Sequence, residues 1–542
     1  MVNNTSNNPL DNSHSKDTEK GNENKGINPV FQPLDSPSYL RDSVLSVKTS
    51  KRVPHSEILR EIIDCVERVD YKELAYPRVT KMMERLKRLE KNSDEYEQID
   101  SSIDNLSVRT KHFVVYSIEN LHLVARKYKF GLCKNNGNIF IYNGEYWGVI
   151  AKEAYHQFLG EAVAIMGVRK VDAKHYEFRD KLFRQFMSTS YLKSPEIDRN
   201  TVVVNLQNGT FQISSNGNIL RPFNQSDFLT YQLPFEYNEN SQSPIFQSYL
   251  DRVLPDKDCQ KVLAEYVGYV FIKNGNETLK EEKALILYGS GANGKSVFFE
   301  IVNALLGEEN ICNFSLQSLT DQNGYYRAKI SHKLVNYSSE INGKLQSSIF
   351  KQLVSGEPVE ARLPYGEPLT IKQYAKLIFN CNELPRDVEQ THAFFRRFLI
   401  IPFDVTIPDD EQDKNLHTKI IDKELSGVFN WVLSGLERLL IQKEFTSCEA
   451  SHNALNLYKK QSDSVKMFIS EREYVKSPTS TKLIKFLYDE YKSFCIEDGF
   501  RPVNKTNFKK RLEASNIEVR RINIGNVAYL SGGASLNYSV RL

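Results

Sequence analysis

The sequence lacks the features that mark membrane-spanning, secreted or disulfide-stapled proteins. It contains no uninterrupted apolar run of about 18 residues, the length that a membrane-spanning helix needs. The first residues, MVNNTSNNPLDNSHSK, hold no apolar segment of the kind found in secretory signals. The seven cysteines are scattered, and no two stand in the CxxC spacing of a zinc ribbon or redox motif. We therefore expect a cytoplasmic protein with reduced thiols and no membrane contact.

A strong net charge is also missing, but the average hides a division. The 542 residues include 71 basic and 68 acidic side chains, a formal net charge of +3. Residues 459–542 hold 16 Lys and Arg against 9 Asp and Glu, so this segment carries +7 and the preceding 458 residues carry −4. Hydrophobic residues make up 40% of the chain, which is enough to bury cores and excludes a wholly disordered or collagen-like protein.

Length and composition divide the chain into several domains, since about 150 residues form a typical domain. Residues 1–53 are rich in Asn, Ser, Asp and Lys and are predicted to be a disordered tail. Residues 54–109 show apolar residues at helical spacing, and residues 110–240 show a mixed α/β pattern. Residues 241–458 carry the motifs described below, and residues 459–542 form a separate basic domain. The predicted fold class is therefore α/β.

Turn dipeptides between apolar runs predict two hairpins in the α/β segment. The first turns at residues 143–144 within NIFIYNGEYWGVI, and the second at residues 208–209 within TVVVNLQNGTFQI. Residues 152–166 are predicted to be helical, and residues 244–275 to form two short amphipathic helices. The helical segment 54–109 is interpreted either as a docking or oligomerisation element or as plain packing helices.

A glycine-rich segment supplies the most specific motif. The string ALILYGSGANGKSVFFEIVNALLG combines an apolar strand, a GxxxxGK[ST] loop and a helical pattern in the order that a phosphate-binding loop requires. Backbone N–H groups of such a loop face an anion, the Lys295 ammonium reaches the β- and γ-phosphates, and the Ser296 hydroxyl takes a position on Mg²⁺. The predicted nucleotide-binding residues are Gly289, Ser290, Gly291, Ala292, Asn293, Gly294, Lys295 and Ser296.

Polar residues at the ends of the following strands are candidates for the chemistry of hydrolysis. Strands are predicted at residues 311–316 and 333–340, and the second ends in Glu340, a carboxylate that could polarise water and help to hold the metal. A further strand at residues 375–382 ends in Asn382, the first choice for a contact with the γ-phosphate or water, with Asn380 as the second choice.

Two arginines, Arg396 and Arg397, directly precede a fifth predicted strand in FFRRFLIIPF. They lie far from their own glycine loop in the sequence and could instead reach the nucleotide of a neighbouring subunit. An arginine in that position stabilises the charge of the transition state. The alternative is a surface arginine that pairs with a phosphate or carboxylate.

The order of these motifs resembles that of a superfamily 3 helicase. GSGANGKS is followed by LVNYSSE, KQLVSGEPVEARLPYGEP, LIFNCNELP and FFRRFLIIPF. More narrowly, residues 110–500 are similar to the phage, plasmid and poxvirus primase–helicase family, which includes replication initiator helicases of staphylococcal mobile islands. The resemblance implies an AAA+ P-loop ATPase, usually a hexameric ring with an N-terminal collar, that hydrolyses ATP with Mg²⁺ and translocates on single-stranded DNA. It assigns Walker A to Lys295 and Ser296, the Walker B acid to Glu340, the sensor to Asn382, and the arginine finger to Arg396 or Arg397, with Arg397 preferred.

The sequence departs from this family in two places. Ser339 precedes Glu340 where many P-loop motors have a second acid, so metal binding would depend more on Ser296 and water. The predicted DNA-tracking hairpin, residues 358–370, has no lysine at its tip and carries Glu367 there. Its candidate DNA contacts are Lys351, Arg362, Tyr365 and Lys372, the tyrosine through stacking on a base or sugar.

The basic segment 459–542 follows a helix, helix, helix, hairpin pattern that is typical of a winged helix. Helices are predicted at residues 464–473, 481–496 and 504–512, and the hairpin at Gly525-Asn526. The alternatives are a solvated basic face and a winged helix that binds a protein partner. The predicted duplex contacts are Lys505, Asn507, Lys509, Lys510, Arg511, Arg520 and Arg521.

Together these features predict a replicative DNA helicase that loads itself at an origin. The expected partners are single-stranded DNA in the ring channel, origin duplex DNA, further copies of the chain in a homo-oligomer, and host replication proteins. One alternative is a bifunctional primase–helicase, although no zinc motif or convincing carboxylate set supports primer synthesis. A second alternative is an origin-binding ATPase switch without motor activity. A small-molecule P-loop kinase is a distant third, because it would need neither the arginine pair nor the basic domain.

Overall fold

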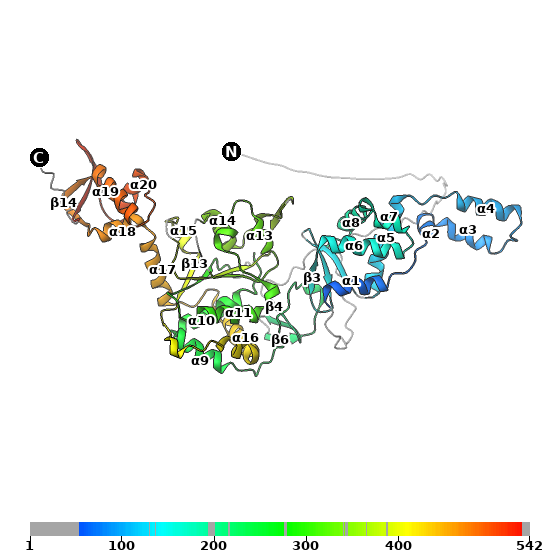
Figure 1. Ribbon diagram of the computed structural model, residues 1–542, viewed down its shortest axis with the longest axis horizontal. Helices are drawn as coiled ribbons and strands as arrows, with labels where there is room; N and C mark the ends of the chain where they lie inside the picture. Colours follow the sequence, from blue (N-terminus) through cyan, green and yellow to red (C-terminus); the bar gives the residue numbers. More distant parts are fainter. Residues whose placement is uncertain are drawn as a thin grey trace, which may run out of the picture. The chain divides into compact units, whose positions relative to one another are not determined.

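The computed structural model describes residues 54–128, 130–135, 137–192, 201–214, 217–275, 279–339, 341, 345–364, 366–385 and 388–533 (Figure 1). The predicted disordered tail, residues 1–53, lies outside the described residues. Within the described part, no helix is both long enough and apolar enough to cross a membrane. The described elements combine α-helices with several β-sheets, so the predicted mixed α/β class is confirmed.

Helices form the first part of the described chain, as predicted for residues 54–109. They are α1 His55–Asp64, α2 Tyr71–Ala75, α3 Arg78–Leu86 and α4 Asp94–Asp104, followed by α5 Thr110–Lys127. Helix α4 begins where the Ser93 hydroxyl accepts a hydrogen bond from the Tyr96 N–H. Val79 and Leu86 of α3 pack with Ile103 of α4 in a small cluster of their own.

A three-stranded antiparallel sheet and three helices follow. The strands are β1 Gly131–Asn135, β2 Asn138–Tyr142 and β3 Trp147–Ile150, and the helices are α6 Lys152–Ile165, α7 Lys170–Lys174 and α8 Tyr176–Thr189. The predicted hairpin at residues 143–144 is confirmed, since Tyr142 lies opposite Trp147. Helix α6 confirms the predicted helix at 152–166, and its buried side chains share one core with α1, α5 and α8.

The second predicted hairpin is part of another antiparallel sheet. Its strands are β4 Val202–Leu206, β5 Gly209–Ser214 and β6 Gly217–Arg221, and the short helix η2 Gln225–Asp227 follows. Gly209 has φ 147°, and a Cβ there would lie 2.6 Å from the Arg221 carbonyl oxygen, so the turn requires glycine. The buried side of this sheet shares a core with α9 Pro244–Val253 and α10 Lys257–Tyr269, the two helices predicted in 244–275.

Five parallel strands form the sheet that carries the glycine loop (Figure 1). They are β7 Ala284–Tyr288, β8 Ile311–Cys312, β9 Val335–Ser338, β12 Lys376–Cys381 and β13 Phe398–Pro402, in the order β13-β7-β12-β9-β8. Tyr288 therefore lies between Cys381 and Pro402. Because parallel strands end at the same edge of a sheet, the residues that follow these three meet there.

Helices cover both faces of this sheet. Leu285 and Leu287 belong to a core with α11 Lys295–Leu306 and α16 Leu416–Gln442, whereas Ala284 and Ile286 belong to a core with α14 Ser347–Ser355 and α17 Glu449–Gln461. This alternation is the period of two of a strand buried on both faces. The remaining short helices are η3 Glu308–Asn310, α12 Leu316–Leu319, α13 Tyr325–Lys329, α15 His392–Phe395 and η4 Asp409–Glu411.

The prediction of one strand in this region is wrong about where the strand ends. The strand expected at 311–316 ends at Cys312, and Leu316 is already the first residue of α12. The reason is the Ser315 hydroxyl, which accepts a hydrogen bond from the Ser318 N–H and starts a helical turn.

The C-terminal elements are α18 Ser464–Glu471, β14 Val475–Leu483, α19 Ile484–Glu497, α20 Lys505–Ala514, β15 Val519–Ile522 and β16 Gly525–Ser531. The three helices are confirmed, but the second begins at Ile484 because residues 475–483 form a strand that pairs with β16. The predicted turn at Gly525-Asn526 is wrong, since Ile522 pairs with Gly525 and the turn lies at residues 523–524. Phe468, Tyr491 and Phe508 join the three helices in one core.

Candidate nucleotide site and nucleic-acid contacts

The glycine loop lies at the carboxyl edge of the parallel sheet, between β7 and α11. Gly289 follows β7 directly, and its N–H donates a 3.1 Å hydrogen bond to the Cys381 carbonyl at the end of β12. Gly291, Ala292 and Gly294 have φ values of 116°, 49° and 86°. These left-handed conformations turn the chain sharply into α11, whose unpaired N-terminal N–H groups favour an anion.

Two of the loop glycines are required by the packing around them. A Cβ on Gly289 would lie 2.4 Å from the Phe403 carbonyl oxygen, and a Cβ on Gly294 would lie 2.7 Å from Val253 Cγ1. Behind the loop, the Tyr249 hydroxyl donates a 2.8 Å hydrogen bond to the Gly294 carbonyl. The loop is therefore held in its conformation by α9 and by the segment after β13.

Lys295 is buried inside the loop. Its Nζ donates to the Gly289 carbonyl at 2.7 Å and to Asn293 Oδ1 at 2.9 Å. Only 6% of the residue is exposed, and this burial lowers the pKa of the ammonium. The Asn293 Nδ2 donates to the Phe403 carbonyl at 2.9 Å, so the amide of Asn293 links the lysine to the strand beside the loop. The next residue, Ser296, is exposed in the first turn of α11.

The two asparagines of β12 occupy different environments. Asn382 follows the strand end directly and is exposed at the edge where the glycine loop begins. Asn380 is buried within the strand, and its Oδ1 accepts a 3.0 Å hydrogen bond from the Tyr337 hydroxyl. Of the two, only Asn382 stands beyond the strand at the mouth of the loop. Glu340, the predicted acid after β9, lies outside the described residues.

The two arginines before β13 differ in burial. Arg397 is 7% exposed; its guanidinium donates to the Ala393 carbonyl and, at 2.9 Å, to Ser355 Oγ, and lies 3.4 Å from Glu282. Burial lowers its pKa. The Arg396 side chain is 45% exposed and forms an ion pair with Glu282. No sequence pattern points to Glu282, because a carboxylate before a strand is normally a solvated surface residue.

The predicted hairpin between β9 and β12 is confirmed. Its strands are β10 Val359–Arg362 and β11 Pro368–Ile371, with Arg362 opposite Pro368. Arg362 is exposed, and its Nε donates to the Gly366 carbonyl at 2.8 Å, while Lys372 is exposed after β11. Lys351, on α14, is paired with Glu389 at 3.0 Å. Tyr365 lies outside the described residues.

Some of the C-terminal residues predicted to contact duplex DNA form ion pairs within the chain, and others are exposed. Arg511 is half-buried and lies 3.2 Å from Asp463, and Arg520 pairs with Glu518 and stacks over Tyr529. Lys509 is half-buried on α20. Lys505, Asn507, Lys510 and Arg521 are exposed, as is the paired Arg520.

Three family models match parts of the chain. The model described as D5 N terminal like matches residues 122–255, and the one described as Poxvirus D5 protein-like matches residues 460–528. A family of unknown function, DUF5906, matches residues 287–397, which contain the glycine loop and the arginine pair. Each of the three models covers less than half of the chain.

Two curated relatives of the chain are viral proteins. It is 26% identical over 224 residues to "Putative helicase L207/L206" of Acanthamoeba polyphaga mimivirus, a match over 38% of this chain and 22% of the relative. It is 22% identical over 348 residues to "Putative helicase 121R" of Invertebrate iridescent virus 3, over 55% of this chain and 35% of the relative. The chain thus spans about a fifth to a third of the length of these relatives. Together with the two D5-type models, the matches support a D5-like primase–helicase family.

Solved structures give a weaker similarity. The apo C-terminal region of NrS-1 has a TM-score of 0.43 at 12% identity, covering 77% of this chain and 100% of that one. A second apo structure of this region gives a TM-score of 0.42 at the same identity. At this level the likeness carries no argument about the chain.

Proposed function

We propose that the chain is an ATP-dependent DNA helicase of the AAA+ superfamily 3 type that acts as a ring and initiates replication. The observation that carries this proposal is the placement of Lys295 and the arginine pair at opposite ends of one parallel sheet. The Arg397 carbonyl accepts a hydrogen bond from the Ala284 N–H at the start of β7, whereas the glycine loop follows the end of that strand. Five residues of strand separate the two ends by about 16 Å. An arginine at the starting end therefore suits the nucleotide of a neighbouring chain.

The loop residues fit ATP with Mg²⁺. The left-handed conformations of Gly291 and Gly294 suit a loop that curls around an anion, and Ser296 is exposed in the first turn of the helix that follows. Bound Mg²⁺ would neutralise charge on the β- and γ-phosphates, with Ser296 and Glu340 as its protein contacts. Lys295 would exchange its hydrogen bond with Gly289 for a phosphate oxygen, and Asn382 would orient water or the γ-phosphate.

Arg396 suits the role of arginine finger better than Arg397 does. A finger must extend from its own subunit, and Arg396 keeps 45% of its side chain exposed. Arg397 is held inside its own chain by Ser355 and Glu282, so we assign it to positioning the segment that carries Arg396. This choice reverses the preference for Arg397 that the resemblance gave.

DNA contacts are proposed on two elements. The β10–β11 hairpin presents Arg362 and Lys372 to a strand in the ring channel. The order α18, β14, α19, α20, β15 and β16 is that of a winged helix, and we propose that it binds origin duplex with α20 as the recognition helix. The exposed Lys505, Asn507 and Lys510 of α20 would contact phosphates and base edges.

The test is ATP-dependent unwinding of a forked DNA substrate, with particle size measured on the same sample. Lys295→Ala should lower ATP turnover and unwinding by at least ~100-fold, because the phosphate charge loses its buried partner. Lys423→Ala, at an exposed position of α16, should leave both unchanged. DNA-stimulated hydrolysis without strand displacement would instead support an origin-binding switch, and primer synthesis would support a primase–helicase. Full turnover by Lys295→Ala would refute the nucleotide site.

A further inference from the structure

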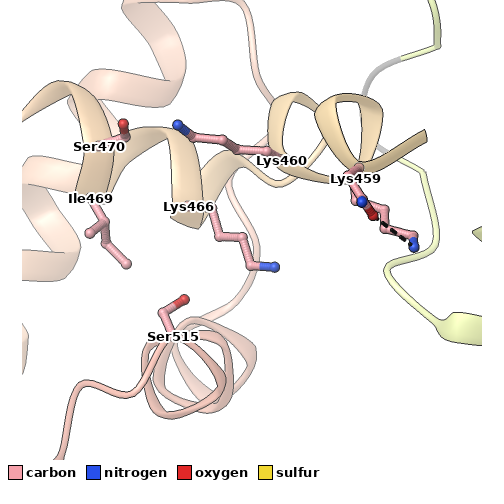
Figure 2. Close-up of a pocket in the computed structure, with 7 residues that line it drawn as sticks. Lys459, Lys460, Lys466, Ile469, Ser470 and Ser515 are labelled. Atoms are coloured by element: carbon pink, nitrogen blue, oxygen red, sulfur yellow. Dashed lines mark hydrogen bonds between the residues drawn. The ribbon is translucent and has the colours of Figure 1, made fainter. Parts of the chain in front are cut away.

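A hollow of about 550 Å³ lies where the end of α17 meets the C-terminal elements (Figure 2). Its wall contains three lysines, Lys459 and Lys460 from the last turn of α17 and Lys466 from α18. Ser515, which follows α20, contributes a hydroxyl, and Figure 2 shows it together with Lys466 directed into the space between the helices. Asn456 and Ser470 complete the polar lining. None of these residues belongs to the nucleotide site or to the duplex contacts considered above.

The three lysines have no carboxylate within ion-pair distance among the described residues. The polar contact of Lys459 there is the Asn456 Oδ1 at 3.5 Å. The acid nearest in sequence is Asp463, which is buried. Its Oδ1 accepts a 3.0 Å hydrogen bond from the Val465 N–H and lies 3.2 Å from Arg511. The lining of the hollow therefore carries three positive charges and no carboxylate.

Some neighbouring cations of the same region do have such partners. Arg472 lies 2.9 Å from Glu497, Arg511 lies 3.2 Å from Asp463, and Lys492 lies 2.8 Å from Asp489. A favourable interaction with the C-terminus of α17 accounts for part of the lysine placement, since cations stabilise helix C-termini by about 0.3–1 kcal/mol. It does not account for Lys466, which is in the first turn of α18, where the helix dipole disfavours a cation.

The chemistry of the hollow selects phosphates rather than bases. Lysine ammoniums are point charges that bind phosphate from many directions, whereas base edges are read by planar guanidinium and amide groups at fixed angles. The wall includes no aromatic ring on which a base could stack; its apolar member is Ile469. Hydroxyl and amide groups add neutral hydrogen bonds of the kind that phosphate oxygens accept.

We propose that this hollow holds the sugar–phosphate backbone of a DNA strand. The inference rests on the proposed DNA-dependent function and adds a contact to it, on α17 and α18 rather than on the hairpin or α20. Helix α17 is itself fixed to the nucleotide-binding sheet, because the buried Tyr458 packs on Phe395 and Phe398 and its hydroxyl donates to the Pro385 carbonyl at 3.0 Å. A DNA strand in the hollow thus touches α17, the helix that packs beside the segment carrying Arg396 and Arg397.

The experiment measures DNA affinity of the full chain against salt. Lys459→Gln/Lys460→Gln/Lys466→Gln keeps a polar side chain that is one atom shorter and removes the three charges. The matched control is Lys170→Gln/Lys174→Gln/Lys181→Gln, three exposed lysines of α7 and α8. Labelled single-stranded and duplex oligonucleotides are titrated between about 50 and 200 mM salt, and each lost phosphate contact should lower the slope of log K against log salt by about 0.7 on a single strand and about 0.9 on duplex.

We expect the hollow variant to lose ~10-fold or more in affinity at low salt on at least one of the two DNA forms, with a slope lower by about 2 on a single strand or by about 2.7 on duplex, while the control matches the parent. A hollow variant with the affinity and slope of the parent on both forms would overturn the proposal. If the parent itself binds neither DNA form, the proposed function fails, which is a different result. In case the triple variant does not fold, acetylation of lysines in the parent provides the second measurement. Bound DNA should protect Lys459, Lys460 and Lys466, and equal labelling with and without DNA would refute the site.

Discussion

Glu282 contacts two adjacent arginines, Arg396 and Arg397, that have different surroundings and different expected roles. It lies beside β7 and is 12% exposed in its side chain. Arg397 directs its two terminal guanidinium nitrogens into the chain, where they donate to the Ala393 carbonyl and to Ser355 Oγ. Arg396 keeps an exposed guanidinium that a second chain could reach. Adjacent identical residues thus have a structural and a catalytic candidate role.

The two arginines should therefore respond differently to removal. Arg397→Ala should lower the free energy of unfolding by about 3 kcal/mol, because the Ser355 hydroxyl and the Ala393 carbonyl lose a charged hydrogen-bond partner at a buried position. Arg396→Ala removes an exposed ion pair and should cost less than about 1 kcal/mol. Chemical denaturation followed by circular dichroism measures both values. Equal destabilisation by the two substitutions would contradict this division of roles.

Two histidines, His122 and His332, should make the stability of the folded protein depend on pH in the acid range. His122 stacks on Phe186 and lies 2.6 Å from Ser190 Oγ, and burial, together with the nearby charge of Arg126, lowers its pKa to about 4. His332 packs edge-on against Phe140, and burial, aided by the charge of Lys273, lowers its pKa to about 4 as well. Both imidazoles are neutral in the folded protein at neutral pH, which is the form that a buried, weakly solvated base favours.

Stability should fall as the pH drops from about 6.5 toward 4. In that window the unfolded chain binds protons at both histidines and the folded chain does not, so each contributes a loss of up to about 3 kcal/mol. Thermal unfolding measured across the window should show a shallower slope for His122→Gln than for the parent. His452→Gln, on the exposed side of α17, should retain the slope of the parent. A slope that His122→Gln leaves unchanged would show that this imidazole does not titrate as its burial implies.

At the scale of elements, the β10–β11 hairpin is stiffened at both ends. Val359 and Ala361 are buried in the core that α14 shares, and Arg327 Nε donates to the Glu360 carbonyl at 2.9 Å. At the other end, Arg362 bonds to the Gly366 carbonyl across the turn. The hairpin can therefore present a cation at a defined position despite the acidic residue near its tip.

Arg362→Ala should weaken binding of single-stranded DNA and lower the salt slope by about 0.7, since one phosphate contact is lost. Lys351→Ala serves as the comparison, because its ammonium already pairs with Glu389 and should contribute less to DNA binding. Fluorescence anisotropy over a salt series measures both variants. An equal loss of DNA affinity in the two variants would contradict the proposed contact between the hairpin and the DNA.

The strand β14 shows why the C-terminal elements were only partly predictable. Most of its residues are exposed and one is Pro478, so neither alternation nor apolar content marks a strand. It exists because β16 supplies a partner: Val475 pairs with Ser531 and Thr481 with Tyr529, with an irregularity between them. Non-local pairing of this kind has no local signature in the sequence.

For the whole molecule, the proposed function implies that hydrolysis needs two neighbouring chains, because Lys295 and Arg396 lie toward opposite edges of one sheet. A mixture of Lys295→Ala and Arg396→Ala chains should recover ATP turnover that neither variant has alone, because mixed interfaces combine an intact loop with an intact arginine. Turnover measured across mixing ratios should pass through a maximum, up to about a quarter of the parent rate if chains mix at random and each interface acts independently. Turnover that stays at the level of the single variants at every ratio would refute an arginine acting in trans.

The sequence by itself determined the elements whose signals are local: the glycine loop with its strand and helix, the hairpins at residues 143–144 and 208–209, and the concentration of positive charge after residue 458. Only the tertiary structure decided which residues meet. It placed β7 between two later strands, buried Arg397 against Glu282, and brought Cys259 and Cys448 within 2.9 Å across 189 residues of chain. It also gathered three lysines around one hollow, where they have no carboxylate partner among the residues that the structure describes. The physical reason is that dihedral preferences and apolar periodicity act over a few residues, whereas burial and ion pairing depend on contacts that exist only after the chain has folded.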